Sequence, residues 1–175
     1  MKKIKEMIKP FAVLVIICIV VGGLLALTNH ITAPIIEKNA EVAAENTRRE
    51  LLPEAASYEK LSVSEEHDID SVYVGKDESG ALVGYIVSVT RSGYKSVSAS
   101  IALDTNGQIT GLSVDASSET KGIGSKIADS DYVAKYLGVS GSANDVDLIA
   151  QATYSSAALR DCVNAAFAVY EEIGD

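Results

Sequence analysis

The apolar residues are concentrated in one run near the N-terminus, and farther along the chain they alternate with polar residues. From Phe11 to Thr28 no residue is charged, and most side chains are Val, Ile or Leu. This run approaches the roughly 20 residues that a helix needs to cross ~30 Å of hydrocarbon. The alternative is a cleaved secretory signal, but its apolar core is usually only ~7–15 residues long, and Ala26-Leu27-Thr28 is a poor cleavage sequence. The pattern predicts a cytoplasmic tail and transmembrane anchor over residues 1–31.

The two flanks of this anchor differ in charge. Four of the first nine residues are lysines against one glutamate, whereas the flank near Glu37 and Lys38 is neutral. Positive charge beside a membrane helix favours the cytoplasmic side. We therefore expect a single-pass protein of the cytoplasmic membrane, with its N-terminus in the cytoplasm and the rest of the chain in the periplasm or outside the cell.

A second helix is predicted from Thr32 to Leu52. Thr32 suits the helix cap, Pro34 suits the first turn, and Pro53 ends the pattern. Residues 32–56 are thus predicted to form a polar stalk or the first helix of a domain. A solvated spacer is the more common role of such a charged helix.

From Tyr58 to Asp115 apolar and polar residues alternate with a period of two, which is typical of half-buried strands. Val87 and Val89 lie in one such stretch. Residues 98–103 and 109–114 form two strand-like runs, and Asn106-Gly107 lies between them. An Asn-Gly pair in this position predicts a β-hairpin.

Helical patterns return toward the C-terminus. Short helices are predicted around 126–128 and 132–137, and a short strand over 146–149. A last helix is expected from about Ser155, with Ser155 or Ser156 as its cap and apolar residues at helical spacing. The predicted fold class is α+β, in which an N-terminal transmembrane helix precedes an antiparallel-sheet domain over residues 57–175 with flanking helices.

Composition excludes some functions. The formal net charge is -9 although the N-terminal flank is basic, so the remainder is strongly acidic and binding to nucleic acid is not expected. Cys18 and Cys162 lie far apart, as do His30 and His67, and there is no CxxC motif. Neither a zinc nor an iron–sulfur site has enough ligands here. Any chemistry therefore uses an organic group or none.

Two short motifs carry candidate chemistry. The first is Glu119-Thr120-Lys121-Gly122-Ile123-Gly124-Ser125-Lys126, whose two glycines permit a sharp turn and a close approach to a ligand. By itself it is also a plain loop that enters a helix. The second runs from Asp147 to Ser156 and places the Thr153 hydroxyl just before a predicted helix. The N–H groups there favour a phosphate, and helix capping is the simpler alternative.

Together the motifs resemble the FMN-binding domain family, and within it the G subunits of the Rnf electron-transport complexes. The C subunits of the sodium-translocating NADH:quinone reductases have the same plan. The matching residues are Ser92-Gly93-Tyr94, Leu103-Asp104-x-x-Gly107-x-Ile109, Glu119-Thr120-x-Gly122-x-Gly124 and Asp147-x-x-x-x-Ala152-Thr153. Ala150 stands where the family usually has Ser or Thr, and Gln151 where it has Gly. Lys121 and Ile123 replace Pro and Leu.

The resemblance implies a covalent cofactor. In the family a flavin transferase takes FMN from FAD and joins its phosphate to the threonine that corresponds to Thr153, within a motif that begins at Asp147. The isoalloxazine ring is expected to be lined by Glu119, Thr120, Gly122, Ile123 and Gly124. Lys126 either favours the reduced ring or is a solvated surface lysine. The remaining residues of the expected cofactor-binding set lie close to Thr153 in the sequence: Ala152, Ser155 and Ser156. The two serines are the alternative acceptors of the FMN phosphate.

The implied function is that of a membrane-anchored electron carrier in an ion-translocating ferredoxin:NAD oxidoreductase. The redox chemistry belongs to the flavin and needs no catalytic acid, base or nucleophile from the chain. The expected partners are the other subunits of the Rnf complex, the flavin transferase and the lipid bilayer. Two alternatives stay open: a component like the C subunit of the quinone reductase, and an exported non-redox binding or scaffold module that has lost the flavin.

Overall fold

The structure is a computed structural model that describes residues 2–63 and 68–174 of the 175-residue chain. The chain divides into two compact units, Met1–Glu45 and Asn46–Asp175, which are described separately. His67, one of the two histidines of the chain, lies outside the described residues.

Helix α1 spans Lys2–Leu51. Its residues up to Glu45 form the first unit, and its remaining residues belong to the second. Among the described residues it is the helix that is long and apolar enough to cross a membrane, within Pro10–Leu51. Large apolar side chains between Phe11 and Leu27 are exposed. The apolar run is therefore a helix whose side chains find no protein partner among the residues that the structure describes.

The predicted start of a second helix at Thr32 is wrong, because α1 continues through Pro34. The Thr28 and Thr32 hydroxyls each donate to the backbone carbonyl four residues earlier, both at 2.9 Å. This is how Ser and Thr behave inside a helix rather than at its cap. The helix ends at Leu51, close to the predicted end before Pro53.

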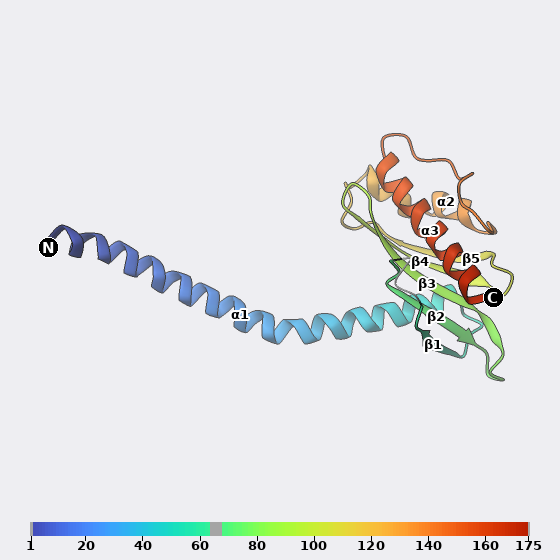
Figure 1. Ribbon diagram of the computed structural model, residues 1–175, viewed down its shortest axis with the longest axis horizontal. Coiled ribbons are helices and arrows are strands. Elements are labelled where there is room, and N and C mark those ends of the chain that lie inside the picture. The colour runs from blue at the N-terminus through green and yellow to red at the C-terminus, as the bar shows by residue number, and fades with distance from the viewer. Residues whose placement is uncertain (1, 64–67, 175) are drawn as a thin grey trace. The chain divides into compact units, whose positions relative to one another are not determined.

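The second unit contains a five-stranded antiparallel sheet in sequence order (Figure 1). The strands are β1 (Ser57–Leu61), β2 (Ser71–Lys76), β3 (Leu82–Ser92), β4 (Ser96–Asp104) and β5 (Ile109–Asp115). The predicted hairpin at Asn106-Gly107 is confirmed between β4 and β5, and Gly107 has a φ of +74°. Asp104 Oδ1 accepts the Asn106 and Gln108 N–H groups at 2.8 Å each, which fixes the turn.

Helices follow the sheet. They are the short helices η2 (Gly124–Ala128), α2 (Ser130–Val133) and η3 (Ala134–Tyr136), and the long helix α3 (Thr153–Gly174). The strand predicted over 146–149 is absent, because these residues form an irregular loop that pairs with no strand of the described chain. Helix α3 begins two residues before the expected start, so Ser155 and Ser156 lie inside its first turn and not at its cap.

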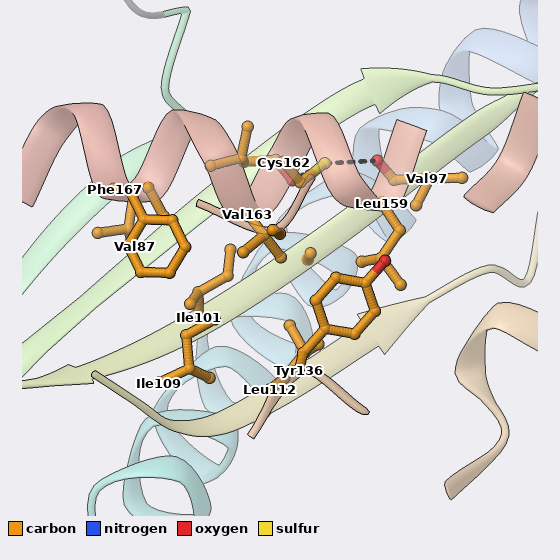
Figure 2. Packing of buried hydrophobic residues seen from close by; sticks show 14 of the residues in the cluster. Val87, Val97, Ile101, Ile109, Leu112, Tyr136, Leu159, Cys162, Val163 and Phe167 are labelled. Atoms are coloured by element: carbon orange, nitrogen blue, oxygen red, sulfur yellow. Dashed lines mark hydrogen bonds between the residues drawn. The ribbon is translucent and has the colours of Figure 1, made fainter. Parts of the chain in front are cut away.

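The main core lies between the sheet and α3, which packs on β3 and β4 (Figure 1). Alternate strand residues such as Val87 and Ile101, which pair across β3 and β4, point into it. Figure 2 shows them beneath Cys162, Val163 and Phe167 of α3. Burial raises the pKa of the Cys162 thiol to about 12. The predicted α+β class is confirmed.

The opposite face of the sheet is covered by the chain just before β1. Leu52 packs with Ile86 and Ala102 in a second cluster, which Leu51 joins. The Tyr58 hydroxyl donates to the backbone carbonyls of Arg48 and Leu52, and burial raises its pKa. Residues 46–52 thus pack on the sheet, whereas the division of the chain at residues 31 and 56 stays a prediction.

Candidate functional site

A cavity of about 270 Å³ opens where three segments of the second unit meet. They are the turn between β3 and β4, the loop that follows β5, and the start of α3. The volume is slightly below the ~300–1,000 Å³ of typical small-molecule sites, so it suits a flat ring system better than a whole nucleotide. The cavity is lined by Tyr94, Glu119, Thr120, Ile123, Gly124, Gln151, Ala152, Tyr154 and Ser155.

The rim of this cavity is aromatic and apolar. Tyr94 is 70% exposed, Tyr154 is 77% exposed and Ile123 is 44% exposed. Single exposed apolar side chains are ordinary, but three around one cavity form an apolar patch of the kind that marks a ligand or partner site. These three side chains can therefore contact a flat, largely apolar ligand in the cavity.

Glu119 is buried at this cavity and is only 6% exposed. Its Oε1 accepts the backbone N–H of Lys95 at 2.8 Å, and its Oε2 accepts the Ser155 hydroxyl at 2.8 Å. A buried carboxylate is costly unless its oxygens are hydrogen-bonded. These two bonds meet that requirement and join the β3–β4 turn to α3.

Two glycines permit this close packing. A Cβ on Gly93 would lie 2.8 Å from Glu119 Oε1 and 3.2 Å from the Ser155 Cα. A Cβ on Gly124 would lie 2.6 Å from Glu119 Oε2 and 2.7 Å from Ser155 Oγ. Any side chain at either position would push the turn or the loop away from the carboxylate. Of the two glycines in the Glu119 to Lys126 motif, Gly124 is thus the one required for packing.

Gly122 has a different role. Its φ is +78°, and a Cβ there would meet nothing within 4 Å. Its N–H donates to Ser125 Oγ at 2.9 Å, while the Thr120 carbonyl accepts the N–H groups of Ile123 and Ser125. Gly122 does not line the cavity. Glycine is needed here for the left-handed backbone that closes the loop.

The start of α3 carries three aliphatic hydroxyls with different surroundings. Ser155 is buried and donates to Glu119. Ser156 is fully buried, donates to the Ala152 carbonyl at 2.8 Å and accepts the Ile149 N–H at 3.2 Å. Thr153 is exposed, and both of its neighbours in the chain line the cavity. Among the Thr and Ser hydroxyls of this turn, Thr153 is therefore the one on an exposed residue.

Not all of the predicted site residues are brought together. Glu119, Thr120, Ile123, Gly124, Ala152 and Ser155 line the cavity, whereas Lys126 lies in a separate depression beside Asp129 and Tyr132. Asp147 lies in a third depression, where its backbone carbonyl accepts the Tyr132 hydroxyl at 3.1 Å. The roles predicted for Lys126 and Asp147 stay predictions.

Three lining residues were not among the predicted site residues, namely Tyr94, Gln151 and Tyr154. Tyr94 belongs to one of the matching motifs, and Gln151 stands out in the sequence only as a departure from the family. For Tyr154 the available signal was an aromatic residue directly after a candidate acceptor. Within the described ranges there is no group of three or more His, Cys, Asp or Glu residues that could hold a metal ion.

An antiparallel-sheet domain with a ring-sized cavity, preceded by a helix of membrane length, defines an anchored ligand-binding module. A family model described as FMN-binding domain matches residues 93–168, and one described as RnfG N-terminal region matches residues 1–51. The G subunit of an ion-translocating oxidoreductase complex from Methanosarcina acetivorans is 31% identical, over 93% of each chain. The G subunit of the Na(+)-translocating ferredoxin:NAD(+) oxidoreductase complex of Acetobacterium woodii is 30% identical, over 97% of this chain and 94% of that one.

The chain belongs to the G-subunit family of the Rnf-type ion-translocating oxidoreductase complexes. Its similarity to the FMN-binding domain family is confirmed, and with its N-terminal helix the chain is a membrane-anchored protein. The crystal structure of Shewanella oneidensis NqrC is similar with a TM-score of 0.48 and 19% identity, over 69% of each chain.

Proposed function

We propose that the chain is the membrane-anchored electron-carrier subunit of an Rnf-type ferredoxin:NAD oxidoreductase, and that FMN is joined to it through the Thr153 Oγ1. The observation that carries the proposal is the exposed Thr153 at a helix start beside a ring-sized cavity. The neighbouring serines support it, because both are buried and hydrogen-bonded within the fold. The partners are the other membrane and peripheral subunits of the complex.

FMN fits the residues at this site. The first N–H groups of a helix have no partner within the helix, so those of α3 can bind the phosphate on Thr153, and the helix dipole stabilises its charge. The cavity next to Thr153 has the size for the ring, with Ile123 and the tyrosines Tyr94 and Tyr154 at its rim. Glu119 at the back and Thr120 can accept hydrogen bonds from the polar edge of the ring. Bound FMN supplies the electron transfer itself.

Attachment requires a flavin transferase and FAD as the flavin donor. The Thr153 oxygen attacks the phosphorus on the FMN side of FAD, a new O–P bond forms, and the bond to the bridging oxygen of the diphosphate breaks. AMP leaves, and the hydroxyl proton of Thr153 passes to solvent or to the transferase. The product is a phosphodiester with one negative charge, and no electrons are transferred in this step.

The test is co-expression of the chain with an active flavin transferase, followed by fragmentation of the peptide that spans Asp147 to Arg160. We expect the FMN mass on Thr153, its complete loss in Thr153→Ala, and partial attachment in Thr153→Ser, because a hydroxyl is required for the ester. FMN on Ser155 or Ser156 would contradict the assignment of the acceptor. A chain without added mass would contradict the covalent flavin.

The lysine-rich N-terminal flank supports an orientation in which the flavin domain faces the periplasm or the cell exterior. In this proposal residues 1–31 form the tail and anchor, residues 32–56 the stalk, and residues 57–175 the flavin domain. Protease added to intact cells, with any outer membrane opened, is expected to digest the chain beyond about residue 32. Protection of the C-terminal domain would reverse the orientation.

A further inference from the structure

We infer that Glu119 is a positioning residue for the flavin ring, because it joins the two segments that carry the aromatic rim of the cavity. This role rests on the proposed function, since it requires that the ring occupies this cavity. Glu119 would act through its neighbours, in addition to lining the cavity.

The carboxylate of Glu119 bridges segments that are distant in the sequence. It binds Lys95, which lies 24 residues earlier, through one oxygen, and Ser155, which lies 36 residues later, through the other. Both bonds are 2.8 Å long. One buried side chain thus holds three segments at a fixed spacing, and the cavity lies where these segments meet.

The two hydrogen-bond donors lie directly beside the tyrosines of the rim. Lys95 follows Tyr94 in the chain, and Ser155 follows Tyr154. One bond to Glu119 holds the backbone N–H directly after Tyr94, and the other holds the side-chain hydroxyl directly after Tyr154; both tyrosines are exposed. Aromatic side chains stabilise a flat ring only at a suitable distance and tilt. Without Glu119 the segments that carry the two tyrosines would no longer be joined by a shared hydrogen-bond acceptor.

The fold accommodates this carboxylate closely. The space at Gly93 and at Gly124 is limited by the Glu119 oxygens and by Ser155. The two donors, a backbone N–H and a hydroxyl, are neutral. Glutamine has nearly the same shape, and its amide oxygen can accept the Lys95 N–H while its NH₂ group donates to Ser155 Oγ. A positioning role therefore predicts that a glutamine at position 119 preserves ring binding and that an alanine there does not.

The experiment measures ring binding separately from covalent attachment. The full chain is produced without the transferase, solubilised in detergent, and titrated with lumiflavin, which is the ring system without the ribityl phosphate. We expect Glu119→Ala to bind lumiflavin about tenfold more weakly than the wild type, since it lacks both hydrogen bonds to the neighbouring segments. We expect Glu119→Gln to remain within about threefold of the wild type.

Asn164→Ala is the matched control, because Asn164 Oδ1 accepts the Ala143 N–H at 2.9 Å and so also ties α3 to a loop, but outside the cavity. It is expected to lower the melting temperature without weakening lumiflavin binding. Ser155→Ala removes one of the two bonds and serves if Glu119→Ala does not fold. Its expected loss of affinity is about threefold.

The same variants, made with the transferase, are compared by the visible circular dichroism of the attached FMN. This signal reports how firmly the ring is held by its asymmetric surroundings. We expect Glu119→Ala to lose most of it while the FMN mass stays on Thr153, and Glu119→Gln to keep it.

Three results would overturn the inference: no lumiflavin binding by the wild type, wild-type binding by Glu119→Ala, or equal losses in Glu119→Ala and Glu119→Gln. The last would mean that the charge itself acts on the ring. Failure of the proposed function is separate, since it is read from the mass on the Thr153 peptide.

Discussion

Gln151→Gly is expected to stabilise the second unit, because Gln151 is held in a backbone conformation that suits glycine. Its φ is +70°, in the left-handed region. The residue is exposed, and it stands in the turn before Thr153 where the resemblance to the family suggests glycine. The substitution removes strain and no buried contact.

The magnitude follows from two opposing contributions. A left-handed conformation costs a residue with a Cβ roughly 1–2 kcal/mol. Glycine loses about 0.5–1 kcal/mol more than alanine in chain entropy on folding. The difference favours Gln151→Gly by about 0.5–1 kcal/mol, which for a unit of this size corresponds to a rise in melting temperature of roughly 2–4 °C.

Near-ultraviolet circular dichroism of the tyrosines is the suitable measurement. All eight tyrosines lie after residue 57 and the chain has no tryptophan, so the signal reports the second unit without α1's membrane segment. Gln151→Ala retains the strain and is expected to leave the melting temperature nearly unchanged. Ala150→Gly, in the same turn but at an ordinary negative φ, is expected to lower it. The reasoning is refuted if Gln151→Gly lowers the melting temperature, or if Gln151→Ala raises it equally.

Three further predictions concern the same unit. A chain that begins at Ser57 is expected to be less stable than one that begins at Asn46 by at least about 2 kcal/mol, because it lacks the leucines that cover the second face of the sheet; equal melting temperatures would contradict this. Hydrogen bonds from the hydroxyl and N–H of Ser117 hold the pKa of Asp115 below its ordinary value of 3.8. The stability that they add is therefore present above that pH and lost as the pH falls through the lowered pKa. Asp115→Asn is expected to have the lower melting temperature near neutral pH and to match the wild type once the pH is below the lowered pKa, whereas a gap that persists there would exclude this cause. Since burial raises the pKa of Cys162 to about 12, its thiol is expected to resist iodoacetamide at about pH 8 until the protein is denatured, and alkylation in the folded state would show that α3 opens.

The strands and the hairpin could be predicted because their signals are local. A period of two between Tyr58 and Asp115 fixes which strand residues face the core, and Asn106-Gly107 fixes one turn. Local signals also misled. Thr32 and Pro34 have the chemistry of a helix start, but the helix before them continues and the Thr32 hydroxyl finds a carbonyl one turn back.

The site could be predicted only in part. The motifs identified the loop after β5 and the start of α3, since each is a short contiguous stretch. They could not identify what binds Glu119, because Lys95 and Ser155 approach it from distant parts of the chain. For the same reason the different surroundings of Thr153 and the two serines became visible only in the folded chain.

The different burial of these hydroxyls has a consequence for the order of events in maturation. In an extended chain Thr153, Ser155 and Ser156 are similar aliphatic alcohols on one short segment. Folding turns two of them inward, where Glu119 and the Ala152 carbonyl accept their hydrogen bonds, and leaves the third at the surface. In the proposed function, a transferase that acts on the folded chain would find only one of these three alcohols on an exposed residue. In the proposed function, a flavin on Thr153 would record that its carrier had already folded.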